Sequence, residues 1–402
     1  MVPKGWTLLQ VSDICKLQNG NSFKPHEWDT QGLPIIRIQN LNGSDNYNYF
    51  SGVPQDKWLV EPGQLLFSWA GTKGVSFGPF IWNGPKGVLN QHIYKVFANE
   101  NVHGHWLYLA LLHITQKIEA QAHGFKSTLL HVQKKDIDNQ FVLTPPVAEQ
   151  KKIAQILSTW DKAISVTEKL LANSQRQKKA LMQQLLTGKK RLLDENGERF
   201  SGEWKRVKLG AIADMNSGGT PKSTVEEYYG GNIPWVSISD MTSNGKWIAT
   251  TEKYLTELGL NSSSARIYPK NSVLYAMYAS IGECSIAAVN LTSSQAILGI
   301  RPKDCLNYEF LYFYLASLKE KIKLQGQQGT QSNLNAGMVK EFELDLPSIR
   351  EQQKIAAVLS AADVEISTLE KKLACLKDEK KALMQQLLTG KRRVKIDEAV
   401  AA

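Results

Sequence analysis

Long apolar runs, paired cysteines and a leader segment are what this sequence lacks. The most apolar stretch, Trp106–Ile114, falls well short of the roughly 18 apolar residues of a membrane-spanning helix. The chain starts without the apolar core of a signal peptide. Its four cysteines are isolated and have no metal-ligand spacing. We therefore expect a cytoplasmic protein with reduced thiols, no membrane segment and no metal site.

Motifs of methyl transfer are also missing. An adenine methyltransferase needs a glycine-rich cofactor loop and an Asn-Pro-Pro-aromatic site for the flipped base. The nearest match, Asn232-Ile233-Pro234-Trp235, has isoleucine in place of one proline, and no such loop precedes it. We interpret it as the entry to a strand.

Nuclease and zinc sites find equally little support. An endonuclease clusters carboxylates with a lysine around a metal ion, and Glu149-Gln150-Lys151 matches only the tail of that pattern. We interpret Glu149 as a solvated charge on a helix. All seven histidines precede residue 132, and His103-Gly104-His105 predicts a loop or helix start rather than zinc ligation. The sequence predicts no catalytic residue, no metal and no cofactor.

Positive charge is abundant but confined. The net charge is +10, and residues 146–208 alone hold 14 Lys and Arg against 7 Asp and Glu. The stretches before and after them are nearly neutral, at about +2 and about +1 by the same count. A polyanionic partner is indicated, met by modest phosphate contact in each globular block.

The chain contains an internal repeat. The segment Lys179–Arg191 recurs, with one substitution, as Lys381–Arg393. The same spacing aligns Glu149-Gln150 with Glu351-Gln352, each a few residues after a proline. Two divergent blocks of about 145 residues precede the repeats. The order is thus variable block, repeat, variable block, repeat.

Each repeat predicts a long helix with a coiled-coil seam. Apolar positions alternate spacings of four and three, with Gly188 and Gly390 placed to end the helices. Lys178 and Lys380 are the only charges in the seam, and they lie near the helix ends, where we expect partners to dock. The predicted spacer residues are Ile153, Leu157, Trp160, Ile164, Leu171, Leu181, Leu185, Ile355, Leu359, Ile366, Leu369, Leu373, Leu376, Leu383 and Leu387.

These helices can pack on their own blocks or on each other. Matching seams in both repeats favour the mutual pair, and a block before each helix favours the antiparallel arrangement with a pseudo-twofold axis. The blocks mix strands and helices, so the fold class is α+β. Strands are expected at Leu33–Ile38, Gly63–Trp69, Val88–Phe97, Ile233–Ile238, Ser272–Met277 and Ser285–Val289, and helices at Gly104–Ala120 and Asn307–Leu324. We place the domains at 1–146, 147–200, 201–347 and 348–402.

The second block carries a specific resemblance. Ser217-Gly-Gly-Thr-Pro221, Tyr228–Met241, Ser293–Ile297 and Gly329–Leu334 follow in order before the proline and the long helix. This succession resembles the target recognition domains of type I restriction-modification specificity subunits, and the likeness extends over nearly the whole chain. The first block departs from it, with Asn19–Pro25 where the second has its Gly-Gly-Thr-Pro turn.

The resemblance implies a non-catalytic subunit that reads a bipartite double-stranded DNA target, one half-site per block. It further implies two methyltransferase subunits docked on the helices, and restriction subunits in the full complex. Lys and Arg suit phosphate or guanine, and amides suit adenine edges. The DNA-binding candidates are Arg37, Gln39, Asn40, Lys73, Gln91, Lys126, Lys222, Ser239, Asp240, Gln295, Gln331, Ser332 and Asn333. The glycine pairs at 218–219 and 230–231 are expected mainly to supply positive φ in loops.

Two rival functions remain open on the sequence. A stand-alone methyltransferase with degenerate motifs would bind its cofactor as an isolated chain. A coiled-coil scaffold would bind proteins but give no sequence-dependent protection of DNA once assembled.

Overall fold

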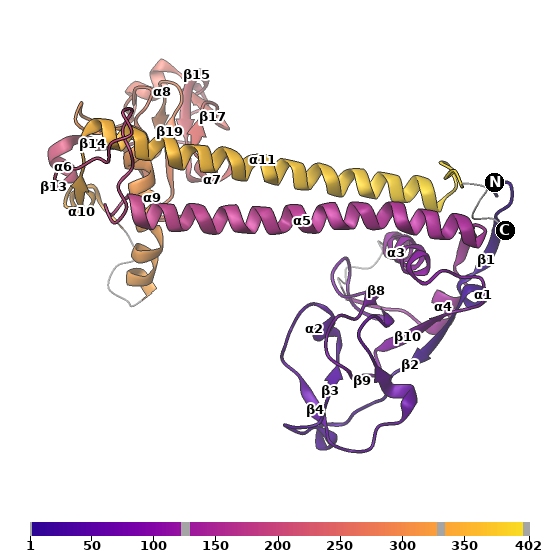
Figure 1. The fold of residues 1–402 in the computed structure, drawn as a ribbon. Coiled ribbons are helices and arrows are strands. Elements are labelled where there is room, and N and C mark those ends of the chain that lie inside the picture. Colours follow the sequence, from indigo (N-terminus) through magenta and orange to yellow (C-terminus); the bar gives the residue numbers. More distant parts are fainter. Residues whose placement is uncertain (1, 122–128, 328–333, 397–402) are drawn as a thin grey trace. The chain divides into compact units, whose positions relative to one another are not determined.

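The protein is described by a computed structural model that covers residues 2–121, 129–327 and 334–396. The chain divides into two compact units. Unit 1 is Met1–Glu168 with Lys372–Ala402, and unit 2 is Lys169–Lys371. Each unit therefore contains one globular block, the start of the helix that follows it and the end of the other long helix (Figure 1). No helix in the described ranges is long and apolar enough to cross a membrane.

Unit 1 opens with a strand-rich block. Its short helices are α1 (Val11–Ile14), α2 (Ile38–Leu41) and α4 (Lys134–Asp138), and α3 (Gly104–Gln121) is longer. Helix α5 (Val147–Leu185) starts in this unit. The strands are β1 (Thr7–Gln10), β2 (Cys15–Asn19), β3 (Leu33–Ile36), β4 (Asn48–Phe50), β5 (Leu59–Val60), β6 (Leu65–Ser68), β7 (Ala70–Thr72), β8 (Gly78–Ile81), β9 (Gly87–Leu89), β10 (Ile93–Ala98), β11 (Leu129–His131) and β12 (Phe141–Thr144).

Unit 2 is built in the same order. Its helices are α6 (Leu209–Ile212), α7 (Ile238–Asn244), α8 (Glu257–Asn261), α9 (Tyr308–Gln327) and α10 (Ala336–Lys340), and α11 (Ile349–Leu388) starts here. The strands are β13 (Lys205–Lys208), β14 (Ala213–Ser217), β15 (Tyr229–Val236), β16 (Trp247–Ile248), β17 (Lys253–Leu255), β18 (Val273–Ala276), β19 (Cys284–Ala287), β20 (Thr292–Ser293), β21 (Ile297–Pro302) and β22 (Glu343–Leu346).

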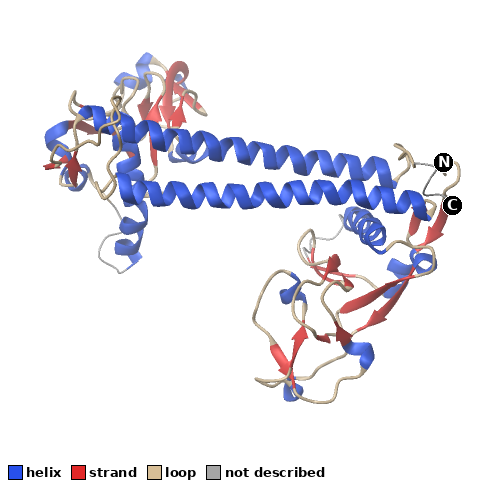
Figure 2. Ribbon diagram, in the orientation of Figure 1, coloured by secondary structure: helices blue, strands red, loops and turns tan. Residues whose placement is uncertain are grey.

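A twisted sheet forms the centre of each unit. In unit 1 its strand order is β2-β10-β6-β8, and in unit 2 it is β14-β21-β18-β19-β16. A second sheet, β4-β3-β9-β5 or β17-β15-β20, lies further along the chain, and a two-stranded ladder, β1-β12 or β13-β22, joins the block's ends. The fully buried Trp106 of α3 and Phe310 of α9 anchor the main cores. The α+β fold class is confirmed, with strands confined to the blocks (Figure 2).

The secondary structure follows the predictions with two corrections. Ile38 and Ile238 were expected to end strands, but each begins a helix, α2 or α7. The expected strand Val88–Phe97 is interrupted between β9 and β10. At Ile238 and between β9 and β10 the chain passes from one sheet to another, whereas α2 connects β3 and β4 of a single sheet.

The two long helices pair antiparallel within each unit. In unit 1, Lys380 Nζ lies 2.5 Å from Asp161 Oδ1, and Lys377 Nζ lies 2.8 Å from Glu168 Oε1. Numbers rise along α5 while they fall along α11, which fixes the direction. The predicted seam positions, Leu369 among them, are all buried or half-buried, and the helices run side by side in Figure 1. The antiparallel coiled coil is confirmed.

The lysines in the seam pair with aspartates. Lys178 pairs with Asp363 of the other helix, and Lys380 pairs with Asp161. Both ammonium groups are therefore used inside the chain. A seam lysine opposite an aspartate fixes the register of the pair, because a shift of one turn would leave both charges half-buried and unpaired.

A buried Glu-Arg-Trp cluster ties each block to the helix pair. Glu351, near the start of α11, accepts two bonds from Arg191, beyond the end of α5: Nε–Oε1 2.5 Å and Nη2–Oε2 2.7 Å. Trp204, at the entry of the block, donates its indole N–H to Glu351 (3.2 Å), and its ring lies under the Arg191 guanidinium at 5.6 Å. Arg191 also donates to the Gly202 carbonyl. We call this set of residues the unit 2 latch.

Unit 1 has the same latch. Arg393 donates two bonds to Glu149, at 3.0 and 2.5 Å, and one to the Lys4 carbonyl. Trp6 donates its indole N–H to Glu149, at 3.2 Å. Glu149 is 5% exposed, so its interpretation as a solvated charge was wrong. A carboxylate this deeply buried is stable only because guanidinium and indole donors satisfy it.

The glutamine after each latch glutamate fixes the long helix to its block. Gln150 Oε1 accepts the His103 N–H (2.8 Å), and its amide donates to the Pro145 carbonyl (2.9 Å). Gln352 makes the same bonds to Asn307 and Pro347. His103 thus lies at the start of α3, as predicted, where its Nδ1 is 3.4 Å from the Trp106 N–H.

Candidate nucleic-acid interface

Several of the predicted contact residues lie where two parallel strands end. In unit 1, β3 and β9 run parallel, with Ile36 opposite Leu89. In unit 2, β15 and β20 run parallel, with Val236 opposite Ser293. The chain leaves both strands of a pair at one edge, so the loops that follow them meet there. This edge of each unit is the candidate interface.

Three candidates of unit 1 lie at this edge. Arg37 precedes α2, and its guanidinium stacks on Trp28 at 5.1 Å, which aims the side chain. Gln39 is exposed and donates to the Asn46 carbonyl. Gln91 follows β9, and its amide lies 3.2 Å from His92 Nε2. The structure therefore brings Gln91 to the same edge as Arg37 and Gln39, from which it is separated by 54 and 52 positions in the sequence.

Asn40 and Asp240 are part of the loop framework instead. Asn40 is 4% exposed: its Oδ1 accepts the Arg37 N–H (2.9 Å), and its amide donates to the carbonyls of Ser44 and Asn46. Asp240, 5% exposed, accepts the N–H groups of Ser237 and Glu252, both at 2.9 Å. Their polar atoms are occupied within the chain, so we withdraw both as base contacts.

Unit 2 presents a different set at the equivalent edge. Ser239 is exposed, with its hydroxyl 2.8 Å from that of Ser237. Gln295, which follows β20 as Gln91 follows β9, is exposed, as is Lys222 in the loop after β14. The frame is shared by the two units, while the side chains on it differ.

Glycines hold this frame by close approach more than by positive φ. A Cβ on Gly218 would lie 2.2 Å from the Ser293 carbonyl oxygen, and one on Gly219 would lie 2.2 Å from the Ala265 nitrogen. In unit 1 a Cβ on Gly20 would lie 2.2 Å from the Asn90 oxygen. Of the two glycine pairs, only Gly230 has a positive φ, +81°. The expectation of positive φ was therefore correct at one position of four.

The remaining candidates are not assembled at this edge. Lys73 donates to the Glu119 carbonyl of α3 (2.7 Å), so its ammonium is directed toward that helix. Lys126, Gln331, Ser332 and Asn333 lie outside the described residues. Leu334, the first described residue after them, donates its N–H to the carbonyl of Met277 (3.1 Å), which directly follows β18.

Sequence reasoning missed an aromatic cluster in unit 1. The ring of Trp69 lies 5.1 Å from His92, 4.6 Å from His131 and 6.0 Å from Tyr94, and its indole donates to the Gln91 carbonyl. Burial, and secondarily His131, lowers the pKa of His92, so the ring is neutral at pH 7. Rings next to an amide suit base contact. The signal available was the tryptophan at the end of an expected strand.

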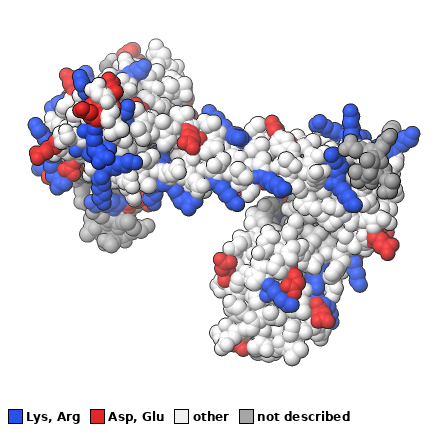
Figure 3. All heavy atoms as spheres, in the orientation of Figure 1, with Lys and Arg blue, Asp and Glu red and all other residues white. Residues whose placement is uncertain are grey.

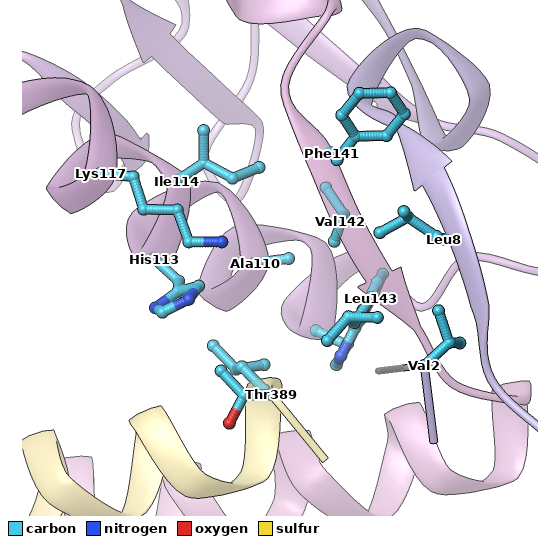
Figure 4. Close-up of a pocket in the computed structure, with 12 residues that line it drawn as sticks. Val2, Leu8, Ala110, His113, Ile114, Lys117, Phe141, Val142, Leu143 and Thr389 are labelled. Atoms are coloured by element: carbon cyan, nitrogen blue, oxygen red, sulfur yellow. The ribbon is translucent and has the colours of Figure 1, made fainter. Parts of the chain in front are cut away.

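A cavity beside the β1-β12 ladder of unit 1 is part of the structural framework. It has a volume of about 280 Å³ and lies between α3, which supplies His113 and Lys117, and the ladder carrying Leu8 and Phe141 (Figure 4). No candidate contact residue lines it. Among the described residues no cluster of three or more His, Cys, Asp or Glu could hold a metal ion.

Basic side chains follow the long helices. On the face drawn in Figure 3, Lys and Arg recur along α5 and α11, whereas the strand-rich part of unit 1 shows few. This matches the concentration of positive charge in residues 146–208. The long helices therefore offer positive charge for phosphate attraction in addition to Arg37 and Lys222 of the interfaces.

A family model for the type I restriction modification DNA specificity domain matches residues 3–173 and again 201–377. The MjaVIII type I restriction enzyme specificity subunit of Methanocaldococcus jannaschii is 26% identical, over 98% of this chain and 94% of its own. The EcoBI specificity subunit of Escherichia coli is 23% identical, over 92% of this chain and 81% of its own.

Solved structures share the fold. The S subunit of a type I system from M. genitalium superposes with a TM-score of 0.59, at 17% identity, over 96% of both chains. A structure described as the basis of complex assembly and conformational transition of a type I system superposes with a TM-score of 0.62, at 18% identity, over 96% of this chain and 98% of the other.

Proposed function

The chain belongs to the type I restriction-modification DNA specificity family, and on that premise we propose that it reads a bipartite double-stranded DNA target, one half-site per unit. One observation carries the proposal. The two units hold the same strand-end frame, fixed by the same close glycine approaches, but present different side chains on it. A protein that reads two different half-sites needs this combination of constant frame and variable surface.

We assign direct readout to a smaller set than the sequence predicted. Arg37, Gln39 and Gln91 read one half-site with help from Trp69, and Ser239, Gln295 and Lys222 read the other. Amides contact adenine edges bidentately, and guanidinium contacts guanine. The half-sites differ because the position of the Arg37 guanidinium in unit 1 is taken by Ser237 in unit 2.

The chemistry belongs to partner proteins. We propose that methyltransferase subunits dock on the paired helices and methylate adenine, and that restriction subunits join them in the full complex. This chain supplies the sequence specificity, works in the cytoplasm where the DNA is, and holds no cofactor. The helix pair fixes the half-site gap.

Matched amide substitutions test the proposal. In a complex reconstituted with its methyltransferase subunits, Q91A should relax one half of the methylated target and Q295A the other. Each should lose about 1–3 kcal/mol of discrimination at one base pair. Exchange of residues 1–146 for those of the M. jannaschii relative should replace the first half alone. Methylated adenines are mapped by sequencing. A substitution in one unit that changed both halves would contradict independent reading.

A further inference from the structure

The central sheets of the two units differ at one edge. Strands β6 and β18 take the same place, beside β10 or β21, and β8 and β19 follow them. Ile81 lies opposite Leu65, as Ile286 lies opposite Val273. In unit 2 a fifth strand, β16, continues the sheet beyond β19. In unit 1 no strand among the described residues continues it beyond β8.

Unit 2 shows what covers this edge. Strand β16 runs parallel to β19, and the N–H groups of Ile286 and Ala288 donate to the carbonyls of Lys246 (2.6 Å) and Ile248 (2.9 Å). The Lys246 ammonium enters the gap between sheet and helices, where it meets Glu309 Oε1 at 2.7 Å and Ser360 Oγ at 2.8 Å. It lies 4.6 Å from the Phe313 ring centroid. An extended Lys-Trp-Ile segment thus fills the edge.

In unit 1 no strand among the described residues occupies the same position. A cavity of about 620 Å³ is lined by β8 and the turn before it, by α3, and by Asp161 of α5. Trp82 uses its N–H and carbonyl on the inner side, with Gln64 (3.0 Å) and Gly63 (2.7 Å). In an antiparallel ladder its neighbour Ile81 then directs its N–H outward. The Ile81 side chain is 36% exposed.

The cavity has the chemistry of a cation site. His105 lies two residues after His103, the partner of Gln150, as Glu309 lies two residues after Asn307, the partner of Gln352. His105 therefore takes the place of Glu309. Its Nε2 is buried without a hydrogen-bond partner in the described chain. Burial lowers the pKa of His105, so the neutral ring can accept a hydrogen bond from a bound cation.

Other groups of the cavity support a cation. The carboxylates of Asp161 and Glu119 line it, and Tyr108 stacks on His105 at 5.8 Å. Asp161 Oδ1 pairs with Lys380, and Glu119 Oε1 accepts the Gly74 N–H at 2.7 Å, so a new cation would join groups that are already hydrogen-bonded, as Lys246 does in unit 2 beside the Lys178–Asp363 pair. A ring face and carboxylates attract an ammonium or guanidinium group.

We propose that the free edge of β8 binds an extended segment of another protein chain by strand addition, with a Lys or Arg in the cavity and a large apolar residue next to it. The occupant is a different protein rather than a second copy, because this chain's own segment of that kind is already used: the Lys246 side chain is 14% exposed. The site lies apart from the DNA-reading edge, so its test does not depend on DNA recognition.

The chain itself supplies the probe. A fluorescein-labelled peptide with the sequence of residues 245–250, Gly-Lys-Trp-Ile-Ala-Thr, is titrated with the full-length protein, and anisotropy is followed. Saturable binding with a Kd below roughly 1 mM is expected. Replacement of the peptide's lysine by norleucine should weaken binding by about tenfold, because the cavity then encloses no cation.

Three protein variants make the test specific. I81P removes the outward N–H, which an edge strand tolerates, and should abolish binding, whereas the matched I81V should bind like the wild type. H105E installs the carboxylate of unit 2 and should tighten the lysine peptide by about tenfold but not the norleucine peptide. Circular dichroism checks that each variant is folded. If I81P is unfolded, the H105E variant alone tests the proposal. No binding to the wild type, equal binding of both peptides, or no gain in H105E would overturn the proposal.

Discussion

Removal of Arg191 from the unit 2 latch should lower the free energy of unfolding by more than the loss of a surface ion pair does. Glu351, whose side chain is 2% exposed beside Arg191, loses both guanidinium bonds in R191M and keeps the bond from the Trp204 N–H. An uncompensated buried carboxylate costs about 3–5 kcal/mol. We take the low end, about 3 kcal/mol, because the arginine itself is 20% exposed and water reaches its place.

Urea unfolding of the isolated chain measures this effect. With a slope of about 3 kcal/mol per molar urea, the midpoint of the affected transition should fall by about 1 M. Tryptophan fluorescence reports on Trp204 directly. The matched control is R206M, which breaks an equally bidentate but exposed pair with Asp345 and should shift the midpoint far less.

A double-mutant cycle separates lost packing from the buried charge. E351Q keeps an acceptor for the Trp204 N–H but removes the charge, so the E351Q/R191M variant should be more stable than R191M alone. Additive effects, with the double variant less stable than either single one, would refute the reasoning that an unpaired carboxylate is the source of the cost.

Two further predictions concern the helix pair. Insertion of seven residues after Ala172 and after Ala374 preserves the seam and adds roughly 10 Å, so methylation mapping should show the same half-sites with a gap longer by up to about three base pairs. Insertion of five residues should prevent assembly. An unchanged gap in an active seven-residue variant would contradict the idea that the helix pair sets the half-site gap. K178M leaves Asp363 half-buried and unpaired and should lower the free energy of unfolding by about 1 kcal/mol. In urea unfolding, K178M/D363L should be at least as stable as the wild type, because apolar residues replace both charges. A double variant less stable than K178M would contradict this.

The periodic features of the fold were readable from the sequence, and the long-range pairings were not. The four-three seam, the terminal glycines and the repeat lie in local spacing, so the helix pair was predicted correctly. The latch joins Arg191 to Glu351 and Arg393 to Glu149, residues 160 and 244 positions apart. Each arginine follows a helix as one of several basic residues, and no local pattern marks it as the partner of a buried glutamate.

The candidate interface shows the same limit. Ser237 and Asp240 have the spacing of a capping box, and the structure confirms that hydrogen-bond pattern, so the local interpretation should have outranked base contact for Asp240. Gln91 is placed beside the other candidates of unit 1 by the parallel pairing of β9 with β3, and Gln295 beside those of unit 2 by the parallel pairing of β20 with β15. Parallel pairing joins strands distant in sequence, and turn residues do not indicate it.

The exchange of arginines between repeats explains why both repeats must be nearly identical while the blocks diverge. Arg191, at the end of the first repeat, completes the latch of the second block, and Arg393, at the end of the second repeat, completes that of the first. A change in either repeat is therefore felt by the block that it does not follow. In the part of the chain that the structure describes, each block meets the latch through a tryptophan and one carbonyl, Trp6 with Lys4 and Trp204 with Gly202. The latch and the Gln150 and Gln352 bonds therefore constrain the entry of each block and the start of α3 or α9, and they leave the surface that reads DNA unconstrained.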